Sequence, residues 1–528
     1  MPNRLLLGFL AVLGFLGGCS SAPMRSDLLT VAESSEWQAT GRHSQVVEFV
    51  NALAAHSDCV RVVEMGKSAE GRSIPLVILA DPMVASAAEA RASGKMVVYA
   101  QGGIHSGECC GKEALQMLAR EIAASKRHPY LKEFVILLAP IYNPDGNERV
   151  SVDNRPGQLG PKEGMGQRAT AEGYDLNRDN TKLDSPEARA LSRLLNEWDP
   201  LLVIDTHTTN GSFHQNTLTF DGPVHPAGDP AIVNFVREVY LPTVSEALQL
   251  RTGYKTTFYG NYNRARTKWT TYDGRPRFGT RARGLRGIVS ILTEAYKYAS
   301  YKDRVLCTKA FCEELLTYAM NHRATFQEIV RQVRERTIEK GRVASESDRV
   351  AIQSKVARLP RDILIHGWVE TESDARKRSV PTDVKHTYTM EHWGAYEPSL
   401  EVVRPVAYAY PARLSSLTEK LKQHGVVMRQ VAALREGDLE VYRVESIMRQ
   451  SRKYQNHNQV QLKVSVTRSR GKIAAGMMVV STAQPLGNLV VYLLEPLAAD
   501  GLTAWNVLDD AIEVGEDFPV SRIMRWLN

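Results

Sequence analysis

The chain has 528 residues, of which 43% are hydrophobic, 24% charged and 7% aromatic, a mixture that excludes disordered, collagen-like and coiled-coil proteins. This length suggests two or three domains and is ample for a large buried core. The formal net charge is +7. Nearly all of it lies between Asn261 and Gly287, where eight lysine and arginine residues face the single acid Asp273, so the rest of the chain is close to neutral.

The N-terminus carries the only apolar run that resembles a membrane segment, residues 5–16, which is too short to span a bilayer. Together with Arg4 before it and Leu16-Gly17-Gly18-Cys19 at its end, it resembles a bacterial lipoprotein signal, which predicts removal of residues 1–18 and lipidation of Cys19. The two serines that follow favour the outer membrane, with the catalytic part facing the periplasm. We expect residues 19–40 to be a linker. Such a lipoprotein rarely meets nucleic acid, so no nucleic-acid partner is expected for the basic segment.

Apolar runs of strand length then alternate with helical stretches, which predicts a layered α/β domain over residues 41–345. The expected strands are nearly all apolar, as in a sheet covered on both faces. They are residues 74–80, 96–100, 134–139, 201–205 and 288–292. Helices are expected over residues 112–124 and after the cap-plus-proline starts Ser185-Pro186 and Asp229-Pro230.

A long helical stretch over about residues 309–340 closes this domain, and a polar segment up to Pro360 marks the expected boundary. Apolar and polar residues alternate over residues 460–467, which predicts a β-strand. Residues 489–494, after a Pro-Leu-Gly turn, are interpreted as another strand. We therefore expect a smaller β-rich domain over residues 360–528.

A metal site is indicated immediately after the expected strand 96–100. His105 and Glu108 are three residues apart, a spacing that places both side chains on one face of a helical turn. Imidazole and carboxylate suit zinc, with a third ligand from elsewhere and a fourth position left for water. His207, after the strand 201–205, is the candidate third ligand because strand ends gather at one edge of an α/β sheet. Either histidine alone would be better explained as a half-buried polar residue.

Four further motifs follow in an order that resembles the zinc carboxypeptidases of the carboxypeptidase A type, the M14 peptidase family. They are Asn143-Pro144-Asp145-Gly146, Asp175-Leu176-Asn177-Arg178, Asp205-Thr206-His207 and Leu292-Thr293-Glu294. The resemblance covers roughly residues 46–318 and implies a mixed β-sheet sandwiched by helices. It also implies one zinc ion held by two histidines and a glutamate, here His105, Glu108 and His207. The tail resembles that of a bacterial subgroup of the family.

The resemblance implies a role for other residues around the ion. Glu294 is expected to be the general base for the attacking water and later the acid for the leaving amine. Asp175 is expected to orient His105 from behind. Asn177 and Arg178 are expected to grip the terminal carboxylate of the substrate, a group that the planar fork of an arginine suits.

Two more roles are less well defined by the motifs. Arg168 is the candidate for the arginine that stabilises the oxyanion, and Tyr272 is the candidate for the mobile tyrosine of the family. Their rivals are Arg149, Arg155, Tyr259 and Tyr262. Asp179, directly after the Asn-Arg pair, is expected either to narrow the carboxylate pocket or to pair with Arg178.

Five cysteines remain after the signal segment: Cys59, Cys109, Cys110, Cys307 and Cys312. An oxidising compartment would allow two bridges among them, although Cys307 and Cys312 lie on one expected helix with poor geometry for a bridge. Cys109 and Cys110 adjoin Glu108, and we expect them to be packing residues rather than metal ligands.

The basic segment runs directly into the strand that presents Glu294. Its like charges repel one another, so an anionic neighbour would relieve a cost, whereas the alternative is a solvated loop. We predict that Arg277, Arg281 or Arg283 recognises an additional carboxylate on the substrate. Peptides ending in Asp or Glu and cell-wall peptides carry such a group.

The sequence thus predicts a zinc metallocarboxypeptidase that hydrolyses the C-terminal amide bond of peptides or cell-wall peptides and is attached to a membrane through Cys19. A zinc-dependent deacylase or murein-peptide amidase is the alternative within the same chemistry. A catalytically dead peptide-binding lipoprotein is the alternative from another class. The presence of all three ligands together with Glu294 disfavours the dead receptor.

Overall fold

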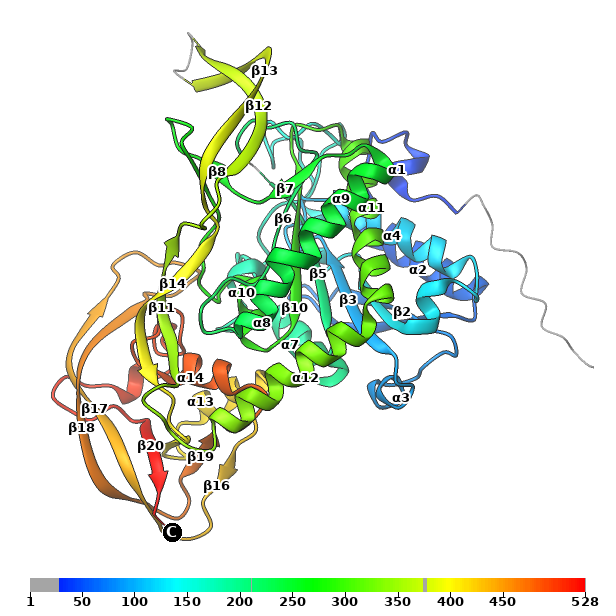
Figure 1. The fold of residues 1–528 in the computed structure, drawn as a ribbon. Helices are drawn as coiled ribbons and strands as arrows, with labels where there is room; N and C mark the ends of the chain where they lie inside the picture. The colour runs from blue at the N-terminus through cyan, green and yellow to red at the C-terminus, as the bar shows by residue number, and fades with distance from the viewer. Residues whose placement is uncertain (1–27, 210, 374–377, 528) are drawn as a thin grey trace, which may run out of the picture.

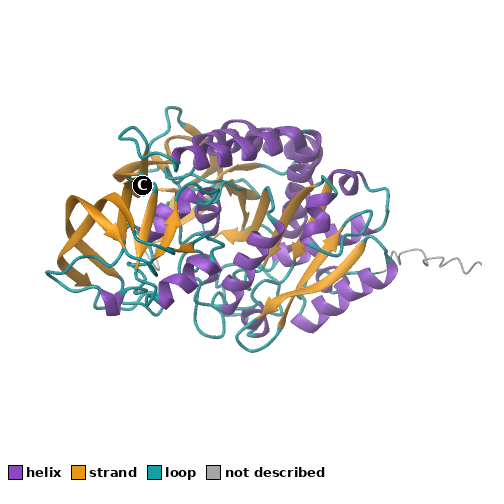
Figure 2. Ribbon diagram, turned by 90° about the horizontal axis from the view of Figure 1, so that it is seen from below, coloured by secondary structure: helices purple, strands orange, loops and turns teal. Residues whose placement is uncertain are grey.

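The computed structural model describes residues 28–209, 211–373 and 378–527, so the signal segment and Cys19 lie outside the described residues. The chain forms a layered α/β part followed by a part built mainly from antiparallel strands (Figures 1 and 2). Among the described residues, no helix has both the length and the apolar character needed to cross a membrane.

The α/β part is organised around an eight-stranded mixed sheet with the strand order β1-β2-β4-β3-β5-β10-β6-β7. Its strands are β1 (Val60–Lys67), β2 (Ser73–Leu79), β3 (Met96–Gly102), β4 (Phe134–Ala139), β5 (Leu202–Thr209), β6 (Leu218–Asp221), β7 (Thr256–Phe258) and β10 (Val289–Tyr296). The four central strands β4, β3, β5 and β10 are parallel to one another, and the strands on either side of them, β2 and β6, are antiparallel to them. All five strands expected from the sequence are present, and the mixed sheet with covering helices is confirmed.

Helices cover both faces of this sheet because alternate strand residues point to opposite sides. In β3, Val98 and Ala100 join one core cluster, whereas Val97 and Tyr99 join another. The first cluster includes residues of α2 (His43–His56), α4 (Cys110–Ala123), α9 (Leu241–Thr252), α11 (Tyr301–Asn321) and α12 (Arg323–Lys340). The second includes residues of α3 (Ala87–Ala92) and α7 (Pro186–Trp198). Shorter helices are α1 (Val31–Ser34), α5 (Pro129–Glu133), α6 (Pro144–Glu148), α8 (Pro230–Asn234) and α10 (Gly279–Leu285).

Two expected helix starts are confirmed, whereas a long helical stretch and the expected linker differ from the prediction. Ser185 caps α7 by accepting from the N–H of Ala188, and Asp229 caps α8 by accepting from the N–H of Ala231. The long stretch expected over residues 309–340 is two helices, since α11 ends at Asn321 and α12 begins at Arg323. The linker was expected over residues 19–40, and its described part, residues 28–40, packs on the α/β part, where Glu33 of α1 pairs with Arg120 of α4 at 2.7 Å.

The C-terminal part is β-rich, and its main sheet has six strands in the order β16-β19-β15-β20-β17-β18. These strands are β15 (Ala407–Tyr410), β16 (Arg429–Gln430), β17 (Arg435–Arg449), β18 (Val460–Ile473), β19 (Met478–Ser481) and β20 (Ser521–Trp526). Two helices, α13 (Ser415–Gln423) and α14 (Gly487–Leu494), accompany it. The strand expected over residues 489–494 is therefore wrong. All six of these residues are buried in α14, and a short fully buried apolar run has no periodicity that separates helix from strand.

Two smaller sheets complete the structure, and one of them joins the two parts of the chain. Strand β11 (Arg349–Ala357), inside the segment taken as a polar boundary, pairs with β14 (Ala395–Val403). The antiparallel strands β12 (Ile363–Ser373) and β13 (Arg378–Trp393) extend as an arm beside β8 (Asn261–Tyr262), as Figure 1 shows. Strand β13 pairs in parallel with β9 (Lys268–Thr270), which belongs to the basic segment. The C-terminal part is thus hydrogen-bonded into the α/β part.

Candidate active site

Strand register places two of the expected site residues next to each other. Strands β5 and β10 are parallel neighbours, and Glu294 is the register partner of His207. Register partners in adjacent strands point to the same face of a sheet. The expected general base and the expected third metal ligand therefore lie side by side.

The loop after β3 brings the other two ligands to this sheet edge. The N–H of Glu108 donates to the carbonyl of His105 (2.9 Å), which closes a turn just before α4. Helix α4 begins against β5, and a Cβ atom added at Gly111 would lie 1.9 Å from Thr206 Oγ1. The absence of a side chain at Gly111 is what lets the helix, and with it Glu108, come so close to His207.

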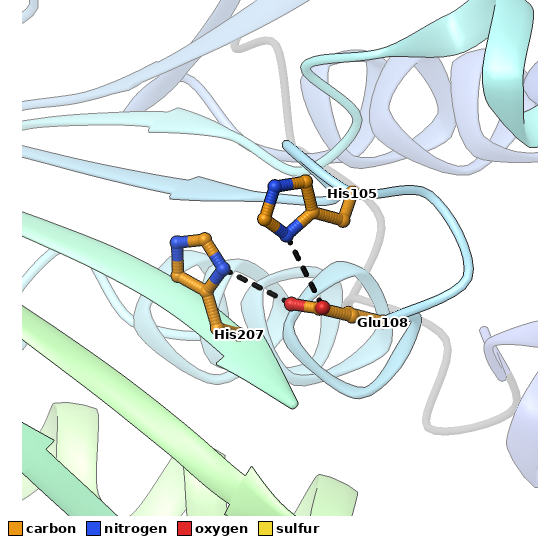
Figure 3. Close-up of side chains that lie close together, drawn as sticks. All are labelled: His105, Glu108 and His207. Atoms are coloured by element: carbon orange, nitrogen blue, oxygen red, sulfur yellow. Dashed lines mark hydrogen bonds and ion pairs between the residues drawn. The ribbon is translucent and has the colours of Figure 1, made fainter. Parts of the chain in front are cut away.

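His105, Glu108 and His207 converge in this buried corner (Figure 3). Glu108 Oε1 lies 3.1 Å from Nδ1 of His105, and Glu108 Oε2 lies 3.0 Å from Nδ1 of His207. One ligand atom from each of the three side chains lies within 4.8 Å of the others. The same nitrogen of each ring is directed to a single point, which is the arrangement that one shared ion requires.

The opposite nitrogen of each ring faces an aspartate. His105 Nε2 lies 3.0 Å from Asp175 Oδ1, and His207 Nε2 lies 3.3 Å from Asp205 Oδ1. Carboxylates in this position fix the orientation of metal-binding histidines. Although burial opposes it, the neighbouring histidines and arginines hold the pKa of both Asp175 and Asp205 below its usual range. Two histidines, one glutamate and two orienting carboxylates fit zinc by number, type and placement.

Asp205 was missed as an orienting residue although its motif was recognised. It lies two residues before His207 on the same strand, so both side chains point to the same face, and this spacing was the available signal. Asp205 is held in turn by Arg283 Nη1 (3.0 Å) and by Gln101 Nε2 (2.9 Å). Neither contact could be read from the sequence, because both partners lie far away along the chain.

Glu294 is placed to exchange protons beside the triad. Burial raises the pKa of its carboxyl to about 8, and the nearby charge of Glu108 adds to this, against the opposing charges of His207, Arg155 and Arg168.

Two of the three candidate arginines reach the site. Arg168 Nη2 binds Asp175 Oδ2 (2.8 Å), its Nη1 lies 3.2 Å from His105 Nδ1, and its side chain is 43% exposed. Arg155 binds Glu108 Oε1 (2.9 Å) and the carbonyl of Thr208 (2.8 Å), and its side chain is only 9% exposed. Arg149 instead pairs with Glu70 at 2.6 Å. Arg168 is more exposed than Arg155 and stays our candidate for the arginine that stabilises the oxyanion.

The expected carboxylate clamp follows Asp175 in one short helical turn over Leu176–Arg178. Asn177 accepts from the N–H of Gly279 through Oδ1 (2.9 Å), and the guanidinium of Arg178 lies 3.9 Å from the ring centre of Phe278. The expectation for Asp179 was wrong. It is fully buried, binds Lys182 (2.7 Å) and accepts from the N–H of Ser185, so it neither lines a pocket nor pairs with Arg178.

The candidate tyrosines differ in their surroundings. Tyr272 donates to Thr280 Oγ1 (3.1 Å), and the guanidinium of Arg281 lies 3.9 Å from its ring centre. Its rival Tyr259 meets it edge-on, with 5.4 Å between ring centroids. Burial and the charge of Glu294 raise the pKa of Tyr259 to about 12. Tyr262 donates to Glu370 on the β12–β13 arm and is removed from the candidates.

All five described cysteines are free and buried, so the bridges considered for them do not form. Cys110 Sγ lies 3.0 Å from Thr208 Oγ1, and burial raises the pKa of this thiol to about 11. Burial also raises the pKa of the Cys109 thiol. Thiols of this kind are packing residues, as expected.

The prediction for the basic segment was wrong in a specific way. Its arginines do have anionic neighbours, but these belong to the chain itself. Arg277 pairs with Asp500 (2.9 Å), Arg281 with Asp221 (2.9 Å) and Arg283 with Asp205 (3.0 Å). The three arginine side chains are at most 3% exposed. None of them is placed to recognise a carboxylate on a substrate.

Comparison with known proteins agrees with this site. Residues 46–213 match the family described as zinc carboxypeptidase, Peptidase M14. The chain is similar to Carboxypeptidase 2 of Trichophyton rubrum, with 23% identity over 496 residues that cover 90% of this chain and 85% of that protein. It is also similar to Carboxypeptidase 2 of Trichophyton tonsurans, with 22% identity over 477 residues that cover 87% and 81%. A solved structure of a metallo-carboxypeptidase from Pseudomonas aeruginosa in complex with (2-guanidinoethylmercapto)succinic acid is 16% identical, with a TM-score of 0.39, and the match covers 54% of this chain and 68% of that one.

The buried two-histidine, one-glutamate cluster and the family match define a hydrolase that uses one zinc ion. More specifically, residues 46–213, which include all three metal ligands, match the M14 zinc carboxypeptidase family.

Proposed function

We propose that this enzyme removes single residues from the C-terminus of peptides. The observation that carries the proposal is the position of Asn177 and Arg178. They lie in the same short turn as Asp175, which binds the metal ligand His105. A substrate carboxylate held by this turn would present its last amide bond to the metal site. Arginine suits that carboxylate because its planar fork can donate two parallel hydrogen bonds.

Each residue of the site has a separate role in the proposed reaction. When bound by His105, Glu108 and His207, the ion would make a water molecule more acidic and polarise the scissile carbonyl. Glu294 accepts the proton of the attacking water and returns it to the departing amine nitrogen. Arg168 donates to the oxygen that becomes negatively charged.

The test is digestion of matched peptides with a free or an amidated C-terminus, together with cell-wall peptides, followed by mass spectrometry. We expect loss of one C-terminal residue from the free acids and little reaction with the amides. Glu294→Gln should retain zinc and lose about 10²- to 10⁴-fold in kcat, whereas His207→Ala should lose zinc. Equal cleavage of acids and amides would refute the clamp and favour a deacylase or an amidase.

We also propose that the enzyme is a lipoprotein of the bacterial outer membrane that faces the periplasm and is anchored through Cys19. The signal-like residues 1–18 and the cysteine that follows them support this proposal. The Cys19→Ser variant should not incorporate labelled fatty acid. Release of the unaltered protein as a soluble species with a different N-terminus would contradict it.

A further inference from the structure

A hairpin of the C-terminal part reaches the active site. Strands β17 and β18 are antiparallel partners, and the chain that connects them ends in a tight turn at Gln455 and Asn456. The N–H of Tyr454 donates to the carbonyl of His457 (2.8 Å), and the N–H of His457 donates back to Tyr454 (3.0 Å). Gln455 and Asn456 have φ angles of +52° and +66°. Positive φ at both central residues matches the twist of a two-residue hairpin, but it strains residues other than glycine.

The residues on either side of this turn hold it against the α/β part. His457 binds Asp184 Oδ2 through Nε2 (2.7 Å) and Asn506 Oδ1 through Nδ1 (2.9 Å). The ring of Tyr454 lies 5.0 Å from the guanidinium carbon of Arg277, and this arginine is paired with Asp500. These contacts hold the hairpin in place without any contribution from Gln455 or Asn456 at its tip.

The tip makes one contact of a different kind. Gln455 Oε1 accepts a hydrogen bond from the backbone N–H of Asp175 (2.8 Å). Asp175 binds His105, pairs with Arg168 and begins the turn that carries Asn177 and Arg178. A single amide of the C-terminal part therefore touches the residue from which the metal ligand, the oxyanion candidate and the carboxylate clamp are all positioned.

We propose that Gln455 is a positioning residue for substrate binding, because it fixes the backbone at Asp175 and thereby the direction of the Asn177–Arg178 clamp. The inference rests on the proposed function, in which this clamp holds the terminal carboxylate of a peptide. Two observations favour this role over a merely structural one. His457 and Tyr454 already hold the hairpin in place, and the strained turn directs Gln455 to the backbone N–H of Asp175 beside the site.

The decisive variant is Gln455→Met, which keeps the length of the side chain and removes the acceptor oxygen. We expect the KM for a peptide with a free C-terminus to rise about tenfold, while kcat stays within about threefold. The preference for the free acid over the matched amide should fall by a similar factor. In a Glu294→Gln background, the Kd for the same peptide, measured by calorimetry, should rise in parallel, with unchanged zinc content.

The matched control is Asn456→Ala, which strains the same turn but leaves the side chain of Gln455 intact. We expect its KM and its acid-to-amide preference to equal those of the wild type. A Gln455→Met variant that loses only thermal stability or kcat, with KM and preference unchanged, would overturn the proposal. So would an equal rise in KM for Asn456→Ala, because the turn and not the hydrogen bond would then be responsible.

The same data separate this inference from the function on which it rests. If the wild-type enzyme does not distinguish free acids from amides, the proposed carboxylate clamp fails. If the wild type distinguishes them and Gln455→Met does so equally well, only the role of Gln455 fails.

Discussion

Arginine is concentrated in two regions of this molecule, and the two regions use it in opposite ways. In the basic segment, Arg277, Arg281 and Arg283 are buried and paired with aspartates of the same chain. Around the metal site, the side chains of Arg168 and Arg178 are 43% and 20% exposed and lie beside residues that position ligands. A run of positive charge in a sequence therefore does not indicate a binding surface. What distinguishes the two regions is exposure: the arginines of the basic segment are buried with their carboxylates, whereas Arg168 and Arg178 lie beside Asp175 and still reach solvent.

The largest effect should come from breaking one of the buried pairs. Arg281→Met leaves Asp221 buried without its cation, which should lower the free energy of unfolding by about 3–5 kcal/mol in a urea titration. The double variant with Asp221→Asn should recover most of this loss, since no unpaired charge is left. The ratio of kcat/KM for peptides ending in Glu and in Leu should not change in Arg281→Met. A changed ratio would restore this arginine as a specificity residue.

A site arginine should behave in the opposite way. Arg168→Gln should lower kcat/KM by about 10²- to 10³-fold if Arg168 is the oxyanion donor that we propose, as the loss of such a donor does. Its free energy of unfolding should fall by less than that of Arg281→Met, because Asp175 keeps His105 and Arg178 as partners. Arg149→Gln is the control, since Arg149 pairs with Glu70 away from the triad and should affect neither quantity. Full activity of Arg168→Gln would transfer the role to Arg155.

A smaller effect on stability is expected from a buried glutamate that has no arginine paired with it. Glu187 in α7 is fully buried, and no salt bridge to it is found among the described residues. Burial, together with the charge of Asp145, raises its pKa from 4.5 to about 7. Because the folded state holds this proton more tightly than the unfolded chain, the stabilising contribution is complete below pH 4.5 and is lost as the pH rises through 7.

Glu187→Gln removes that titration. Measured by urea unfolding, the variant should be more stable than the wild type at pH 8 by about 1–3 kcal/mol, and the difference should shrink at pH 5. A wild-type protein whose stability does not fall between these two pH values would show that Glu187 is not held protonated.

The sequence was informative where the signal is local. The apolar runs of β3, β5 and β10 placed the sheet, and the spacing of His105 and Glu108 together with the order of the family motifs placed the ligands. Prediction from the sequence failed where a residue contacts a partner that lies far away along the chain. Asp221 and Asp500, which neutralise Arg281 and Arg277, could not be matched to them by spacing. The contact between Gln455 and Asp175 joins residues that are 280 positions apart. The prediction of a strand at residues 489–494, which form part of helix α14, failed for another reason. Complete burial removes the alternation of apolar and polar residues by which a helix is distinguished from a strand.

The parallel pairing of β9 with β13 also governs how the protein reaches its folded state. Strand β9 belongs to the part of the chain that holds the zinc ligands, yet the neighbour that covers one of its edges comes from residues 378–393. Until that later stretch is available, the edge of β9 is an open template for unwanted pairing with other chains. Contacts between such distant segments also form slowly. Formation of this sheet is therefore coupled to the presence of residues 378–393, and a shortened chain that ends before β13 would leave this edge of β9 unpaired.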